Sequence, residues 1–128
     1  MNRSTLRWGI AILTIITAAI HLFLGITGLG DGQDTTLDVL FILNGLGYLA
    51  LLAALLGWLP VLGTRPGLTH ILYIGFTALT FILFFVMNPI DHLDAVSIPA
   101  KAAEALLIIA LVLHWNASRA AAPQARTS

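Results

Sequence analysis

Five polar residues inside long apolar stretches are the positions in this sequence best suited to chemistry. They are His21, Asn44, Tyr48, Lys101 and Glu104. Ionisable and amide side chains are costly in hydrocarbon, so within a membrane span they usually face the interior of a helix bundle. A lysine, a glutamate and a histidine together can bind a polar ligand or transfer a proton. We therefore predict that these five residues line a ligand-binding polar pocket, and we assign no catalytic residue.

The depth of these residues along their stretches places three of them at one level. His21 lies about nine residues before the end of the first stretch, and Asn44 and Glu104 lie about seven residues into the second and fourth. At about 1.5 Å per residue, all three are roughly 10–13 Å from the same boundary. Lys101 lies one turn nearer to it. In the alternative interpretation these residues only hold the helices together, with Glu104 paired to Lys101 or His21.

Four apolar stretches must position these side chains, at residues 8–29, 37–62, 71–87 and 98–115. Of the 128 residues, 59% are hydrophobic and only 9% are charged, whereas soluble domains have about 25% charged residues. Each stretch is close in length to the roughly 20 residues that a helix needs to cross about 30 Å of hydrocarbon. Their short connections favour antiparallel neighbours. We predict an all-α fold: one domain at 1–116 forming a four-helix transmembrane bundle of up-down-up-down topology, and a disordered tail at 117–128.

Apart from Lys101 and Glu104, the charged residues lie between the stretches or near their ends, and they are segregated by sign. The arginines precede the first stretch, separate the second from the third, or follow the fourth: Arg3, Arg7, Arg65, Arg119 and Arg126. The aspartates lie at the other connections: Asp31, Asp34, Asp38, Asp91 and Asp94. The positive-inside rule therefore predicts a multi-pass protein of the plasma (inner) membrane with both termini in the cytoplasm. Trp8, Trp58 and Trp115 fall at the arginine-bearing boundary, as in an interfacial aromatic belt.

The first stretch also carries a stripe of small and polar residues. Thr14, Thr17, His21, Gly25 and Gly28 recur at steps of three and four, which places them on one helical face. Small residues at this spacing allow close packing of helices in membranes. We expect this face to lie against a neighbouring helix.

Several classes of function are excluded or disfavoured. The absence of cysteine rules out disulfides, thiolate metal sites and thiol redox chemistry. Arginines this sparse do not form a nucleic-acid surface, so we expect no nucleic-acid partner. No phosphate-binding loop or nucleophile elbow is present. We predict no cofactor.

Two further groups of residues raise alternatives. Asp91, His92 and Asp94 could collect a divalent cation, although a solvated acidic loop is the simpler interpretation and we predict no metal site. His70 and His114 lie near the same ends of antiparallel spans, where two imidazoles could hold a haem. We predict no haem, because nothing else in the sequence supports one.

Three short segments resemble a known group of proteins. They are Ala19-Ile20-His21-Leu22-Phe23-Leu24-Gly25, Phe41-Ile42-Leu43-Asn44-Gly45-Leu46-Gly47-Tyr48 and Lys101-Ala102-Ala103-Glu104. With them the chain resembles small uncharacterised four-helix integral membrane proteins of prokaryotes. The resemblance implies a four-span fold and no particular activity.

We therefore predict a binding or accessory subunit with an outward-side polar pocket for a lipid or small molecule. Its expected partners are membrane lipids, with a homo-oligomer or a larger membrane complex as further options. Two alternatives stay open: a membrane enzyme that uses Glu104 or His21 as acid/base on a lipid-soluble substrate, and a proton or ion pathway formed on oligomerisation. A continuous water-filled path through the bundle would favour transport. A closed pocket would favour binding or catalysis, and a filled interior would favour a structural subunit.

Overall fold

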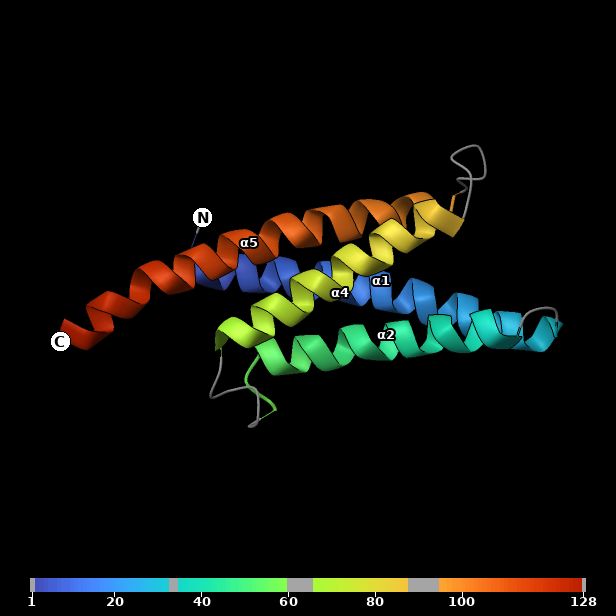
Figure 1. Cartoon of the computed structure of the whole chain (residues 1–128), viewed down its shortest axis with the longest axis horizontal. Coiled ribbons are helices and arrows are strands. Elements are labelled where there is room, and N and C mark those ends of the chain that lie inside the picture. Colours follow the sequence, from blue (N-terminus) through green and yellow to red (C-terminus); the bar gives the residue numbers. More distant parts are fainter. Residues whose placement is uncertain (1, 33–34, 60–65, 88–94, 128) are drawn as a thin grey trace.

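The computed structural model describes residues 2–32, 35–59, 66–87 and 95–127, with the backbone alone at 66 and 121–127. Over these residues it consists of four helices and has no strand: α1 (Arg3–Asp31), α2 (Thr35–Leu55), α4 (Pro66–Met87) and α5 (Ser97–Thr127). Successive helices run in opposite directions, and the two termini lie toward the same end of the bundle (Figure 1). The predicted all-α fold of four helices is confirmed for this part of the chain.

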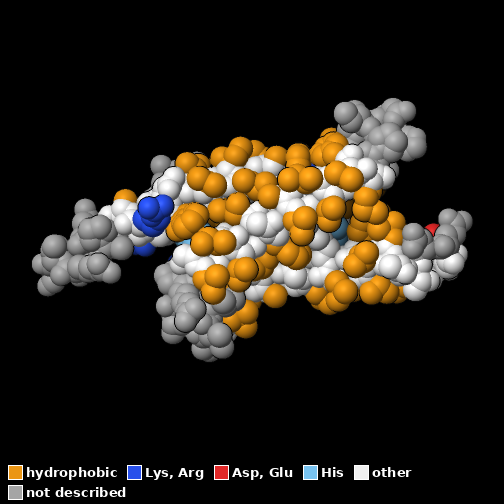
Figure 2. All heavy atoms as spheres, in the orientation of Figure 1, with side chains coloured by type: hydrophobic (Ala, Val, Ile, Leu, Met, Phe, Trp, Pro, Cys, Tyr) orange, Lys and Arg blue, Asp and Glu red, His pale blue; other side chains and the backbone are white. Residues whose placement is uncertain are grey.

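Each of the four helices is long and apolar enough to cross a membrane. Large apolar side chains cover the outer surface, as Figure 2 shows for one face, whereas threonine, histidine and glutamate side chains are buried. Water-soluble proteins have the reverse distribution, and polar groups turned inward are typical of membrane bundles. By the length and composition of its helices, the chain is a small multi-pass membrane protein.

The two ends of the bundle differ in charge. Arg3, Arg7 and Arg119 lie at the end where α1 begins and α5 passes, which we call the arginine end. Asp31 and Asp38 lie at the opposite end, which we call the aspartate end. On the face drawn in Figure 2, the visible basic and acidic side chains lie at these two ends. This separation follows from the alternating direction of the helices.

The helices begin at or before the positions expected from the apolar stretches. The first was expected from residue 8, but α1 begins at Arg3, because the Asn2 side chain caps it by accepting a hydrogen bond from the Thr5 amide at 2.8 Å. The third was expected from residue 71, but α4 begins at Pro66. Proline suits a first helical position because it lacks the amide hydrogen that would be unpaired there. Hydropathy alone does not detect these polar first turns.

The second helix ends earlier than expected. The second stretch was expected to run to residue 62, but α2 ends at Leu55. Gly57 adopts the left-handed conformation (φ 84°), and the Trp58 amide donates to the Ala53 carbonyl at 2.9 Å, which forms a Schellman motif. Residues 60–62 lie outside the described part of the chain.

The fourth helix is longer than expected. It was expected to stop near residue 115, before a disordered tail at 117–128, but α5 continues to Thr127. Alanine is the strongest helix former, and this segment contains five alanines, which accounts for the continuation.

Each helix packs against two others, because α1 and α4 both contact α2 and α5. The α1–α2 interface is the tightest at its glycines. A Cβ atom built on Gly25 would lie 2.6 Å from the Asp38 carbonyl oxygen and 2.6 Å from Ile42 Cγ1, and one on Gly45 would lie 2.7 Å from Leu22 Cγ. These glycines let the two backbones approach more closely than any side chain would permit. The expectation that the α1 stripe faces a neighbouring helix is confirmed.

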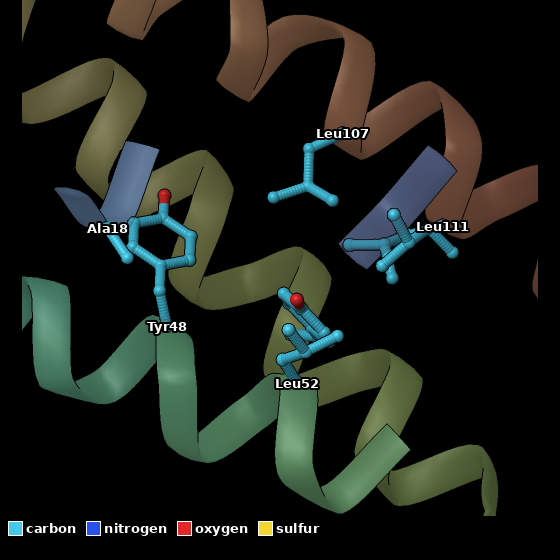
Figure 3. Close-up of a cluster of buried hydrophobic side chains, with 7 residues drawn as sticks. Ala18, Tyr48, Leu52, Leu107 and Leu111 are labelled. Carbon is cyan, nitrogen blue, oxygen red and sulfur yellow. The ribbon is translucent and has the colours of Figure 1, made fainter. Parts of the chain in front are cut away.

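Apolar side chains fill the middle of the bundle. Figure 3 shows this core, which contains Ile10, Ala18, Tyr48, Leu52, Tyr73, Leu107 and Leu111. The Tyr73 hydroxyl forms a hydrogen bond with the Thr14 hydroxyl across the bundle. The interior between the polar residues near Glu104 and the arginine end is therefore packed.

Candidate functional site

A buried carboxylate lies at the centre of the candidate site. Glu104 of α5 is completely buried, and its Oε2 lies 2.6 Å from Nζ of Lys101. The two residues are three positions apart, which puts them on the same helical face. Glu104 Oε1 accepts a hydrogen bond from the Thr17 hydroxyl at 3.2 Å and lies 3.8 Å from His21 Nε2. We call Thr17, His21, Lys101 and Glu104 the polar cluster.

The α1 half of the polar cluster has a defined proton arrangement. His21 Nδ1 lies 2.8 Å from the Thr17 carbonyl oxygen, which can only accept, so Nδ1 carries the proton of this bond. In neutral His21 the Nε2 atom is then an acceptor, and it faces Glu104 Oε1, which is also an acceptor when the carboxylate is ionised. A proton added to Nε2 would replace this acceptor–acceptor contact with a charge-assisted hydrogen bond. The contact between His21 Nε2 and Glu104 Oε1 therefore holds no proton when His21 is neutral and Glu104 is ionised.

Lys101 is held on two sides. Its ammonium group pairs with Glu104 and also lies 4.6 Å from the centre of the Phe84 ring of α4. A charge removed from water needs such compensation, since an unpaired one would cost several kcal/mol. The pair places two opposite charges in a packed apolar bundle.

The two remaining predicted site residues, Tyr48 and Asn44, both belong to α2 but face different neighbours. The Tyr48 ring lies 6.1 Å from the His21 ring, and its hydroxyl points from α2 into the bundle (Figure 3). Asn44 turns instead to α4, where its amide donates to the Thr80 hydroxyl at 2.7 Å. Among the described residues, Asn44 Oδ1 has no hydrogen-bond partner, and the Tyr48 hydroxyl, although close to the Thr77 and Thr80 side chains, forms no hydrogen bond of normal geometry. Such buried atoms without partners are uncommon and call for an explanation.

The structure thus brings together three of the five predicted site residues, His21, Lys101 and Glu104, and places Tyr48 beside His21. Asn44 belongs to the adjacent α2–α4 contact. An outward-side pocket stays a prediction: four of the side chains expected to line it are buried, and Asn44 is half-buried against Thr80.

The sequence analysis did not identify two buried polar side chains as possible site residues: Thr17, near Glu104, and Asp38, at the aspartate end. Thr17 was placed only in the packing stripe, although its position one turn before His21 was a usable signal. Asp38 was grouped with the loop aspartates, but it lies in the first turn of α2 and is buried against Gly28, where a Cβ atom would lie 2.0 Å from its Oδ1. Glu104 is therefore not the only buried carboxylate.

The histidines considered for haem contact each other directly. His70 Nε2 and His114 Nδ1 are 2.9 Å apart, so one ring donates to the other. Two nitrogens that bound one metal from opposite sides would be about 4 Å apart, at about 2 Å per bond. The described arrangement is an imidazole–imidazole hydrogen bond.

The structure does not test the alternative of a divalent-cation site. Asp91, His92 and Asp94 all lie outside the described residues. Within the described residues, no group of three or more histidine or acidic side chains is arranged to hold a metal ion.

Comparison with known proteins identifies a family. A model for a family of unknown function (DUF7475) matches residues 5–115, which includes the second and third candidate spans whole and most of the first and fourth. No curated protein and no solved structure matches the chain. The match supports the expected likeness to uncharacterised proteins, whereas their four-helix membrane fold and prokaryotic origin stay predictions.

Proposed function

Because the chain belongs to DUF7475, a family of unknown function, no activity comes to it from relatives, and we propose a function from its own geometry. The protein is a small membrane-embedded binding or accessory subunit. Its polar cluster binds a lipid or small molecule that carries a hydrogen-bonding group. The observation that carries this proposal is the buried Glu104, paired with Lys101 and in electrostatic interaction with Tyr48, whose hydroxyl forms no hydrogen bond of normal geometry among the described residues.

The positions of these groups favour binding over catalysis. Glu104 and His21 face each other and not a solvent-accessible surface, whereas an acid/base catalyst must reach a substrate atom. A ligand with one donor and one acceptor could engage Tyr48 and Glu104 while leaving the Lys101 ion pair intact. The membrane enzyme acting through Glu104 or His21 stays an alternative, and it would require a substrate to displace one of these contacts.

A proton site is the second candidate function, and a specific observation favours it. His21 Nε2 and Glu104 Oε1 face each other at 3.8 Å with no proton between them when His21 is neutral. Passage across one chain is disfavoured because Ile10, Leu107 and Leu111 pack the interior toward the arginine end. A transport role would therefore need a path between subunits of an oligomer.

The proposal includes the orientation of the protein in the membrane. The arginine end faces the cytoplasm of a cell whose plasma (inner) membrane holds the protein, with both termini inside. The separation of Arg3, Arg7 and Arg119 from Asp31 and Asp38 supports it. Membrane lipids surround the apolar surface, and a homo-oligomer or a larger complex remains part of the proposal.

Native mass spectrometry of the full chain in mild detergent tests the binding function. We expect a non-covalently bound molecule on the wild-type protein and its loss from Glu104→Gln. Asp38→Asn is the matched control, because it removes the other buried carboxylate from the α1–α2 interface. The same spectra report the number of subunits. A wild-type protein without a bound molecule, or equal retention by Glu104→Gln and wild type, would contradict the proposal.

A further inference from the structure

A second group of side chains lies far from the polar cluster, at the arginine end. His70 of α4 and His114 of α5 form their hydrogen bond there, and both rings are buried. Trp115 stacks on His70 with ring centres 5.9 Å apart and an angle of 11°. The Arg119 guanidinium lies 5.6 Å from the Trp115 ring centre. These contacts form a continuous chain from α4 to the guanidinium of α5.

Two more cations of the arginine end come from α1. Arg3 and Arg7 both interact electrostatically with the His114 ring. They are four residues apart, which puts them on one face of α1. The three arginines are exposed, while the histidines beneath them are not. We call Arg3, Arg7, His70, His114, Trp115 and Arg119 the basic cluster.

No acidic side chain of this protein balances the basic cluster. The sequence contains no aspartate or glutamate before Asp31, between Asp38 and Asp91, or after Glu104. Like charges gathered on one surface repel one another, so an external anion would stabilise the arrangement.

We propose that the basic cluster is a binding site for the phosphate-bearing headgroup of an anionic phospholipid. Guanidinium groups match the oxygens of a phosphate in a bidentate manner, and three of them lie at this end of the bundle, on α1 and α5. Trp8 and Trp115 lie at the same end, where indole rings favour the headgroup level. The exposed apolar surface that begins immediately beside them suits acyl chains. A lipid, whose phosphate is continuous with two apolar chains, fits this border better than a free anion.

The test uses full-length protein in mixed micelles that contain phosphatidylglycerol and phosphatidylcholine with identical acyl chains. Native mass spectrometry then counts the molecules of each lipid that remain bound. Wild-type protein should retain phosphatidylglycerol in preference. Replacing two exposed cations in Arg7→Gln/Arg119→Gln should reduce this preference about 30-fold, since each arginine near an anionic surface contributes about 1 kcal/mol and tenfold corresponds to about 1.4 kcal/mol.

Three controls separate the alternatives. Arg7→Lys/Arg119→Lys preserves the charge and should keep most of the preference, and thermal unfolding verifies that each variant is folded. Glu104→Gln should leave the preference unchanged, because Glu104 lies outside the basic cluster and the two sites are independent. Inorganic phosphate should not displace the lipid.

Four results would overturn the proposal. They are equal retention of the two lipids by wild-type protein, an undiminished preference in the glutamine double variant, equal losses in the lysine and glutamine double variants, and displacement of the lipid by inorganic phosphate. The last result would assign the site to a free anion.

Discussion

Replacing Gly25 with alanine tests the close contact between the α1 and α2 backbones. The new Cβ atom would lie 2.6 Å from the Asp38 carbonyl oxygen, which belongs to the α2 backbone and cannot move without shifting that helix. Overpacking of this kind costs about 1–3 kcal/mol. Alanine also favours a helix over glycine by about 1 kcal/mol. We expect Gly25→Ala to lower the free energy of unfolding by up to about 2 kcal/mol after this offset.

Gly75→Ala is the matched control. Gly75 is also inside a helix, α4, but a Cβ atom there would meet no atom within 4 Å. This variant should therefore gain the helix preference without the overpacking cost. Because that gain is common to both variants, the difference between them isolates the α1–α2 contact and should be about 1–3 kcal/mol.

Unfolding of the purified variants in mixed micelles, followed by helical circular dichroism as denaturing detergent is added, measures both free energies. Equal effects of the two substitutions would refute the reasoning, because Gly25 would then have as much free space as Gly75. Gly25→Leu should extend the series with a larger loss, since a longer side chain must displace more of α2.

Three further predictions follow from the charges and hydrogen bonds. In intact cells, a membrane-impermeant thiol reagent should label a cysteine in Asp34→Cys and should not label one in Arg65→Cys. Labelling at position 65 would contradict the proposed orientation. Lys101→Met leaves a buried carboxylate without its cation and should lower the free energy of unfolding by about 3–5 kcal/mol, more than Glu104→Gln does; losses near zero for both variants would place the pair in solvent. Tyr73→Phe removes one interhelical hydrogen bond and should cost about 0.6 kcal/mol and at most about 1.7, measured by the same unfolding assay; a larger loss would require a further role for this hydroxyl.

Much of the fold could be predicted because it depends on local properties of the chain. Four stretches of sufficient apolar length indicate four helices, and their short connections indicate alternating directions. The ends were less predictable, because Asn2 and Gly57 terminate helices through hydrogen bonds and backbone conformation that hydropathy does not report. The continuation of α5 through the alanine-rich segment after Trp115 follows helix propensity, which the polarity of that segment does not report.

The candidate site was predictable only in part. Lys101 and Glu104 are three residues apart on one helix, so their pairing followed from the sequence. Their common level with His21 followed from counting residues at a constant rise. Asn44 shares that level too, yet it turns to Thr80, because residue counting gives the depth of a side chain and not the rotation of its helix.

What the sequence by itself determined about this protein is therefore its spans, the opposite charges of its two ends and the depth of its polar residues. The tertiary structure decided which of these residues meet. Asp38 is buried because Gly28 leaves space for it, and His70 bonds to His114 because α4 and α5 turn those faces toward each other. Such contacts depend on helix rotation and separation, which side chains distant in the sequence set together through packing.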